Sequence, residues 1–422
     1  MVNNDVVVVG AGPAGCQCAR DAAARGYDVT VLETEGEEEF PARSNKSTGG
    51  TFPSMMSSFG IPDDVVMNFT DKVVLESPEN HLVQEQSGAV LEFGEFKEYL
   101  VEDAREKGAC FEFGCRASKP LTRDGKVVGV QVNGDEEVRG TVTVDASGPS
   151  AAVAKHLGLT ELDRGRQAVG IEYQMDGVDL DPDGKPDLRD AMMLRLDHDY
   201  APGGYSWIFH TGGETAKVGV CYIQNNIHSR RANQGYRIDD YLQEWIEDDE
   251  RFDDASVIDD IHHRGSGHIQ NPHRFSAPGF LAIGDTVPTI DPVWGEGIDK
   301  CMQSGRAAAV TVDNCLMEGD GRPTGERMKV YDEKWRGEIA PNRGKRLMMA
   351  ELLYRLDNDR YDRLLRDLGQ MDDTSLKNLD DGDITAFLDV IEPGDLELLG
   401  GYIKDRVRGD GRSLREDISA FL

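Results

Sequence analysis

One short segment near the amino terminus limits the possible folds of this chain more than any other feature. Residues 5–9 form a Val-rich apolar run typical of a buried strand, and a Gly-x-Gly-x-x-Gly turn over residues 10–15 follows at once. An Ala-rich helical stretch over residues 16–25 comes next, and a second strand pattern over residues 28–32 ends at Glu33. This order of strand, glycine turn, helix, strand and acid predicts a dinucleotide-binding unit in a parallel α/β sheet.

The three glycines of the turn have different tasks in such a unit. Gly10 permits the tight turn, Gly12 lets a pyrophosphate approach the backbone, and Gly15 allows helix and strand to pack closely. The positive end of the following helix attracts the phosphates. Glu33 is placed to accept hydrogen bonds from the adenosine ribose. The turn by itself does not separate FAD from NAD.

Two later segments repeat the pattern of a strand followed by a turn. Residues 141–148 are an alternating strand that enters a small-residue turn, and a second strand brings Asp285 to the edge where ligands gather in parallel sheets. Gly295 and Gly297 then open a long helical pattern over residues 298–316. A carboxylate at Asp285 suits the hydroxyls of a ribityl chain, and the helix dipole suits negative charge on a reduced flavin.

Together these three segments resemble those of a group of flavoproteins that includes aromatic hydroxylases and geranylgeranyl reductases. Proteins of this group bind one FAD through three such segments, and the match covers roughly the first 320 residues. The resemblance implies FAD as the resident cofactor, and no second glycine fingerprint indicates a separate NADPH domain. The motif and the resemblance assign cofactor contacts to Gly10, Gly12, Ala14, Gly15, Glu33, Lys46, Ser47, Thr48, Gly50, Ala117, Asp285, Gly295, Gly297 and Ile298.

The segment over residues 46–50 aligns with the Arg-Cys-Gly-x-Gly loop of the geranylgeranyl reductase family. The resemblance implies that its backbone wraps the flavin, and that Ser47 occupies the position of a cysteine proposed to assist reduction in some relatives. A serine hydroxyl is a far poorer acid than a thiol. The proton donor therefore stays open, and the catalytic candidate is an ordered water held by Ser47 or Thr48.

An aromatic pattern lies in a region of many strand signals, residues 167–273. Tyr205-x-Trp207-x-Phe209 alternates as a half-buried strand does, and on physical grounds alone it is equally well an aromatic face of a sheet core. The pattern is similar to the Tyr-x-Trp-x-Phe-Pro signature that lines the isoprenoid pocket of the geranylgeranyl reductase family, with His210 in place of the proline. The resemblance implies substrate contacts at all three aromatic residues. It also implies that reduced FAD saturates geranylgeranyl chains of archaeal membrane lipids.

The predicted fold is therefore α/β, with three parts. They are an FAD-binding parallel-sheet domain of the aromatic-hydroxylase type, an inserted antiparallel β-sheet substrate domain, and a carboxyl-terminal helical region. The expected boundaries are residues 1–60, 93–165 and 274–326 for the first, 61–92 and 166–273 for the second, and 327–422 for the third.

The net charge of the chain restricts the binding partners and the ionic conditions that we expect for this protein. The 422 residues carry a formal net charge of −32, which opposes binding to nucleic acid and favours a cytosol rich in salt. Cysteines and histidines are too irregularly spaced to indicate a metal site. The absence of a long apolar run leads us to expect a cytoplasmic protein. Peripheral contact with the inner face of the cell membrane stays open, because the implied substrate is a membrane lipid.

Two other functions remain open at this point. A flavin-dependent monooxygenase or halogenase shares the cofactor architecture, although the Trp-x-Trp-x-Ile-Pro motif usual in halogenases is absent. A non-catalytic flavoprotein that carries electrons is an alternative of another class. The electron donor is undetermined among NADPH, ferredoxin and a quinol.

Overall fold

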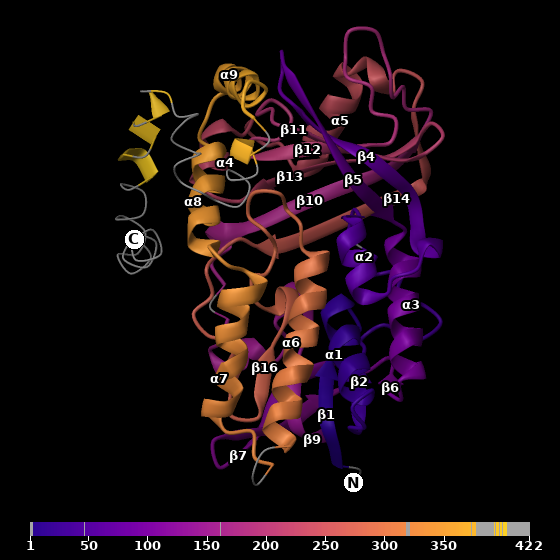
Figure 1. Ribbon diagram of the computed structural model, residues 1–422, viewed down its shortest axis with the longest axis vertical. Helices are drawn as coiled ribbons and strands as arrows, with labels where there is room; N and C mark the ends of the chain where they lie inside the picture. Colours follow the sequence, from indigo (N-terminus) through magenta and orange to yellow (C-terminus); the bar gives the residue numbers. More distant parts are fainter. Residues whose placement is uncertain are drawn as a thin grey trace.

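Two β-sheets stacked along the long axis of the molecule dominate the computed structural model (Figure 1). The structure describes residues 3–45, 47–160, 162–317, 321–372, 374–376, 392, 394–395, 397–398 and 400–402.

The lower sheet in Figure 1 has a parallel centre, with the strand order β15-β16-β9-β1-β2-β6. Valines 6 to 8 of β1 are fully buried, as expected for a parallel strand covered on both faces. An antiparallel hairpin, β7-β8, joins the sheet at β9. The strands are β1 (Asn3–Val9), β2 (Val29–Leu32), β6 (Cys110–Glu112), β7 (Ala117–Arg123), β8 (Lys126–Val132), β9 (Glu136–Asp145), β15 (Ser276–Ala277) and β16 (Phe280–Ala282).

Helices pack on this parallel sheet. They are α1 (Pro13–Ala23), α3 (Phe93–Glu106) and α6 (Ile298–Met317), with the short α2 (Pro53–Phe59) nearby (Figure 1). A Cβ atom on Gly305 would lie 2.4 Å from the backbone oxygen of Ala14, so this glycine lets α6 approach α1 closely. The predicted strand-turn-helix-strand unit and the long helix after Gly297 are both confirmed.

The upper sheet has the order β14-β10-β13-β12-β11-β4-β5-β3 and is antiparallel except between β11 and β4. Its strands are β3 (Gly50–Thr51), β4 (Val66–Glu76), β5 (His81–Leu91), β10 (Gln167–Asp176), β11 (Ala191–Arg195), β12 (Gly204–Gly212), β13 (Thr215–Ile223) and β14 (Ser256–His268). Helix α5 (Ile238–Asp248) buries Leu242 and Trp245 against one face, and α4 spans Asn226–Arg231. The fold class predicted from the sequence is therefore confirmed.

The described part of the carboxyl-terminal region is helical but not continuous. Helix α7 (Gly325–Lys334) leads into a π-helical turn (Trp335–Ile339), and α8 (Arg343–Leu353) and α9 (Asn358–Leu368) follow. Pro341 and the left-handed conformation of Asn342 separate the turn from α8. Much of the predicted region beyond α9 lies outside the described residues, and the predicted domain boundaries stay predictions. No helix that the structure describes is both long enough and apolar enough to cross a membrane.

The remaining elements are single 3-10 turns in the loops. They are Asp63–Val65, Gly148–Ser150, Ala154–Leu157, Arg164–Arg166, Glu250–Phe252 and Gly284–Thr286.

Candidate active site

A cavity of about 2190 Å³ extends from the glycine turn of the lower sheet, past the inner face of the upper sheet, to α9. Pockets for one small ligand measure roughly 300–1,000 Å³, so this volume suits two ligands side by side. The predicted site residues that line it are Gly10, Gly12, Glu33, Ser47, Thr48, Gly50, Ala117, Tyr205, Trp207, Phe209, Asp285, Gly295, Gly297 and Ile298. Ala14 and Gly15 do not line it, and Lys46 lies outside the described residues.

Packing explains the glycines at the nucleotide end. Gly10 has a φ of +99°, and a Cβ atom on Gly15 would lie 2.0 Å from the Gly10 oxygen. A Cβ atom on Gly12 would meet no described atom within 4 Å, so the space over this residue is open. Glu33 accepts hydrogen bonds from the backbone N–H groups of Ala11 (2.8 Å) and Glu35 (3.0 Å), which fixes its carboxylate at the cavity. Gly15 thus serves packing, whereas Gly12 leaves room for a ligand.

Asp285 supplies a buried acceptor at the wall of the cavity. It follows β16, and the Cys301 thiol is hydrogen-bonded to its carboxyl group. Its Oδ1 atom is buried and has no hydrogen-bond partner among the described residues. Burial raises the pKa of Asp285 to about 6, against the opposing effects of Cys301 and the Arg343 guanidinium. A buried acceptor without a partner is costly, so a bound hydroxyl group would fit here.

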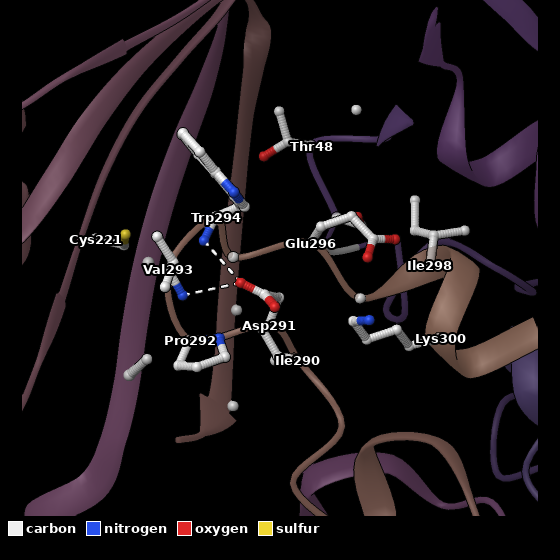
Figure 2. A pocket seen from close by; sticks show the side chains of 18 of the residues that line it. Thr48, Cys221, Ile290, Asp291, Pro292, Val293, Trp294, Glu296, Ile298 and Lys300 are labelled. Atoms are coloured by element: carbon white, nitrogen blue, oxygen red, sulfur yellow. Dashed lines mark hydrogen bonds between the residues drawn. The ribbon is translucent and has the colours of Figure 1, made fainter. Parts of the chain in front are cut away.

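The loop before α6 is held from two sides, as Figure 2 shows in part. Asp291 accepts hydrogen bonds from the backbone N–H groups of Val293 (3.0 Å) and Trp294 (3.1 Å), and Arg346 of α8 donates two more, at 2.5 and 2.9 Å. Burial acts to raise the pKa of Asp291, but these hydrogen bonds and the positive charge of Arg346 hold it below its usual range. The loop is therefore a rigid part of the cavity wall.

Glu296 sits in the same loop and caps α6. Its Oε1 accepts a hydrogen bond of 2.9 Å from the Asp299 N–H in the first helical turn. Burial raises the pKa of Glu296 to about 7, against the opposing charge of Lys300. Glu296 was not among the site residues predicted from the sequence. Its position between Gly295 and Gly297, which were both predicted to contact the cofactor, could have indicated a role at the site.

The loop at residues 47–50 lies against the upper sheet. The Ser47 hydroxyl accepts a hydrogen bond from the Gly49 N–H (3.2 Å). The Lys217 ammonium donates a hydrogen bond to the backbone oxygen of Thr48 (2.8 Å). A Cβ atom on Gly50 would lie 2.5 Å from the Phe209 ring, so only glycine permits this contact. The loop and the aromatic strand therefore meet at the same part of the cavity.

The aromatic residues of β12 have specific polar partners. Tyr205 donates a hydrogen bond to the Trp294 oxygen (3.4 Å), and Trp207 donates from Nε1 to Glu172 (3.0 Å). Sequence reasoning missed the buried Glu172 and Lys217. A charged residue within the apolar strand run over residues 216–222 was a signal for Lys217, because a buried charge needs a partner.

Beyond the aromatic residues the cavity becomes apolar. Its wall there comes from β4, β5, β11, α8 and α9, and includes Leu75, Leu82, Leu194, Met349, Leu353, Leu364, Leu365 and Leu368. The apolar side chains could accept a long apolar chain, and β5 also contributes Gln84, Glu85 and Gln86 to the cavity wall.

Comparisons with known proteins agree with this geometry. Residues 5–58 match the family model described as FAD dependent oxidoreductase, and residues 168–263 match that described as geranylgeranyl reductase catalytic domain. The glycine turn with open space over Gly12, the unpartnered oxygen of Asp285 and the large cavity fit FAD. The protein is an FAD-dependent oxidoreductase.

A similar structure agrees with the fold, and a similar sequence narrows the class of enzyme. A geranylgeranyl bacteriochlorophyll reductase-like protein from Thermoplasma acidophilum has a TM-score of 0.80 at 23% identity, over 94% of this chain and 99% of its own. Digeranylgeranylglycerophospholipid reductase of Haloferax volcanii is 58% identical over 96% of this chain and 98% of the relative. The chain belongs to the digeranylgeranylglycerophospholipid reductase family.

Two more distant proteins share less of the sequence with this chain. A reductase of the same name from Methanoculleus marisnigri is 28% identical over 79% of this chain and 82% of its own. A flavin-dependent brominase has a TM-score of 0.69 at 17% identity, over 97% of this chain and 100% of its own. The brominase shares the fold alone, so the halogenase alternative has no support beyond architecture.

Proposed function

We propose that this protein uses FAD to reduce the C=C bonds of geranylgeranyl chains in an archaeal membrane phospholipid. The observation that carries the proposal is the continuity of the cavity from the nucleotide turn to an apolar end below α9. The name of the Haloferax volcanii relative supports the same substrate.

The cofactor would be held by residues from both sheets. The adenosine diphosphate part would be held by Gly10, Gly12 and Glu33 and would lie beside Ala117. The ribityl chain would be held by Asp285. The flavin ring would be held by the backbones of residues 46–50 and 295–298. Ala14 and Gly15 would support the cofactor site through packing. When bound and reduced, FAD supplies the hydride.

The protein itself must position the alkene and exclude water. An isolated trisubstituted alkene is unreactive, so holding one of its carbons at the flavin is the main contribution of the cavity. Tyr205, Trp207 and Phe209 would form the wall at this point. Ser47 and Thr48 would order the proton supply. We expect Tyr205→Ala and Trp207→Ala each to lower lipid turnover at least about tenfold while FAD stays bound, as measured by flavin absorbance and lipid mass spectrometry.

Mass spectrometry of unsaturated archaeal lipid incubated with dithionite-reduced protein in concentrated KCl tests the function. We expect mass gains of two hydrogens per step. An added oxygen would identify a monooxygenase, and unchanged lipid would identify an electron carrier. Parallel assays with NADPH, ferredoxin and a quinol would identify the donor.

The proposed location is the cytoplasm, with peripheral contact at the inner face of the membrane where the lipid resides. Sedimentation with vesicles of archaeal lipid in concentrated KCl tests the contact. Protein that stays in the supernatant at every lipid concentration would contradict it.

A further inference from the structure

Four residues form one row across the upper sheet. The strand register pairs His263 of β14 with Glu172 of β10, Glu172 with Gly219 of β13, and Gly219 with Trp207 of β12. Residues that are paired across neighbouring strands lie on one face of a sheet. A Cβ atom on Gly219 would lie 2.3 Å from the Trp207 ring, so this glycine lets the indole lie across the row and reach Glu172.

Hydrogen bonds connect this row with the cavity wall. Nδ1 of His263 donates to Oε1 of Glu172 (3.4 Å), since a carboxylate can only accept. The Thr48 hydroxyl also lies near enough to Glu172 to help hold the pKa of its carboxylate down. The side chain of His263 is 16% exposed, Glu172 is buried, and Thr48 lines the cavity (Figure 2). The three groups therefore run from the partly exposed His263 on the edge strand β14, through the buried Glu172, to Thr48 at the cavity.

The charges around Glu172 keep it ionised and able to accept a proton. Burial acts to raise its pKa, but His263, the Lys217 ammonium, Thr48 and Trp207 together hold the pKa below its usual range. The buried Lys217 also donates hydrogen bonds to the backbone oxygens of Thr48 and Leu91. The negative charge of Glu92 acts to raise the pKa of Lys217.

We propose that His263, Glu172 and Thr48 are the proton path of this reductase. The inference rests on the proposed function and identifies its proton source. In each reduction, one alkene carbon receives the hydride that the reductase activity supplies, and the other receives a proton from the Thr48 hydroxyl. His263 first passes a proton to Glu172, and Glu172 passes it to the Thr48 oxygen as the Thr48 hydroxyl gives up its own proton. His263 then takes a proton from solvent. Each double bond thus consumes one hydride and one solvent proton, and the path returns to its starting state.

Thr48 is the catalytic member, and Glu172 and His263 act through it. His263→Asn keeps a hydrogen-bond donor but cannot relay a proton, and His263 has no hydrogen bond to Trp207 through which to disturb the aromatic wall. His262→Asn is the matched control, because His262 is the neighbouring, exposed histidine of β14. Glu172→Gln and Thr48→Val remove the other two relaying groups, and Thr48→Ser restores the hydroxyl.

Single-turnover reduction of lipid by pre-reduced protein in concentrated KCl, followed by mass spectrometry between pH 5 and 9, tests the path. General acid catalysis contributes about 10²–10⁴-fold, so we expect H263N, E172Q and T48V to slow the step at least about tenfold at pH 8. We expect the pH profile of H263N to differ from that of the wild type and H262N to follow the wild type, whereas T48S, which keeps a hydroxyl group, should be faster than T48V. The double variant H263N/E172Q should be no slower than the slower single variant, because the groups act in series.

A second readout needs neither FAD nor lipid. The NMR signal of the His263 side chain should change in E172Q at constant pH, because the variant replaces the carboxylate that accepts the hydrogen bond from Nδ1. An unchanged signal, or H263N turnover equal to that of the wild type at every pH, would overturn the path alone. Wild-type protein that reduces no isoprenoid would instead overturn the proposed function, and with it the use of this path.

Discussion

The two sheets of this protein build their parts of the cavity in different ways. The lower sheet presents mainly backbone, from a glycine turn within residues 10–15 and short loops at the ends of buried strands, with the carboxylates of Glu33 and Asp285 beside it. The upper sheet presents side chains, which come from strands far apart in the sequence and lie in rows on one face. Backbone suits a cofactor shared by many enzymes, whereas side chains determine which substrate is held and where its proton comes from.

This difference has a consequence for how the two regions tolerate change. A backbone site fails when an added atom takes the space that the neighbouring chain or the ligand needs. A side-chain site fails when a partner is removed, since a buried polar group is then left alone.

Gly15→Ala should prevent stable folding of the lower sheet. The added Cβ atom would lie 2.0 Å from the Gly10 oxygen, which is backbone and cannot move aside. We expect a loss of more than about 5 kcal/mol in the free energy of unfolding, measured by denaturant titration in concentrated KCl. Gly12→Ala is the matched control, and it should fold normally but bind FAD more weakly. A normally folded G15A protein would refute the backbone account.

Glu76→Gln should destabilise the upper sheet by about 3–5 kcal/mol, because it breaks a buried ion pair. Arg251 donates to Glu76 at 2.5 and 3.1 Å, and Arg195 pairs with the same carboxylate. Burial opposes ionisation, but these arginines hold the pKa of Glu76 below its usual range. The stabilisation is therefore present above the unfolded-state pKa and lost as pH falls through the folded-state value. Denaturant titration at several pH values checks this, with the exposed Glu79→Gln as control.

Gly219→Ala should displace the Trp207 indole and cost about 1–3 kcal/mol, as overpacking does in other proteins. The added Cβ atom would lie 2.3 Å from the ring. We expect lower lipid turnover and a changed tryptophan emission, with FAD still bound. Gly170→Ala is the stability control, since its Cβ atom would lie 3.5 Å or more from its neighbours. Unchanged emission and turnover in G219A would contradict the close fit of indole and glycine.

Glu296→Gln tests the loop that joins the two regions. Because burial raises the pKa of Glu296 to about 7, its protonated form stabilises the folded protein below the unfolded-state value of 4.5. This contribution is lost as pH rises through 7. Relative to the wild type, E296Q should therefore gain roughly 1–2 kcal/mol between pH 4.5 and 8 in cofactor-free protein. Unfolding curves at both pH values check this, and the exposed Glu326→Gln should show no such gain. A constant difference between E296Q and wild type would refute the assignment.

Local sequence was enough to predict most of the lower sheet. The strands β1 and β2, the glycine turn and α6 each depend on short-range patterns, and all were expected at nearly their observed bounds. The strand that carries Tyr205 and Trp207 was also expected, although it extends to Gly212. The break between the π-helical turn and α8 was not anticipated, because apolar spacing continues across it.

The side-chain network of the upper sheet could not be predicted in the same way. Glu172, Gly219 and His263 lie in separate strands, and a register change of one residue would turn each side chain to the opposite face. Nothing in the sequence near Glu172 indicates that Trp207 and Thr48 are its partners.

By itself, the sequence determined that this chain has a nucleotide turn, a large acidic excess and an aromatic strand, because these features depend on neighbouring residues or on totals. Only the tertiary structure decided that Asp285 keeps a buried oxygen without a described partner and that a histidine is connected to the cavity through a buried carboxylate. The physical reason is that hydrogen bonding and burial depend on distances in space, which strand register and packing set together.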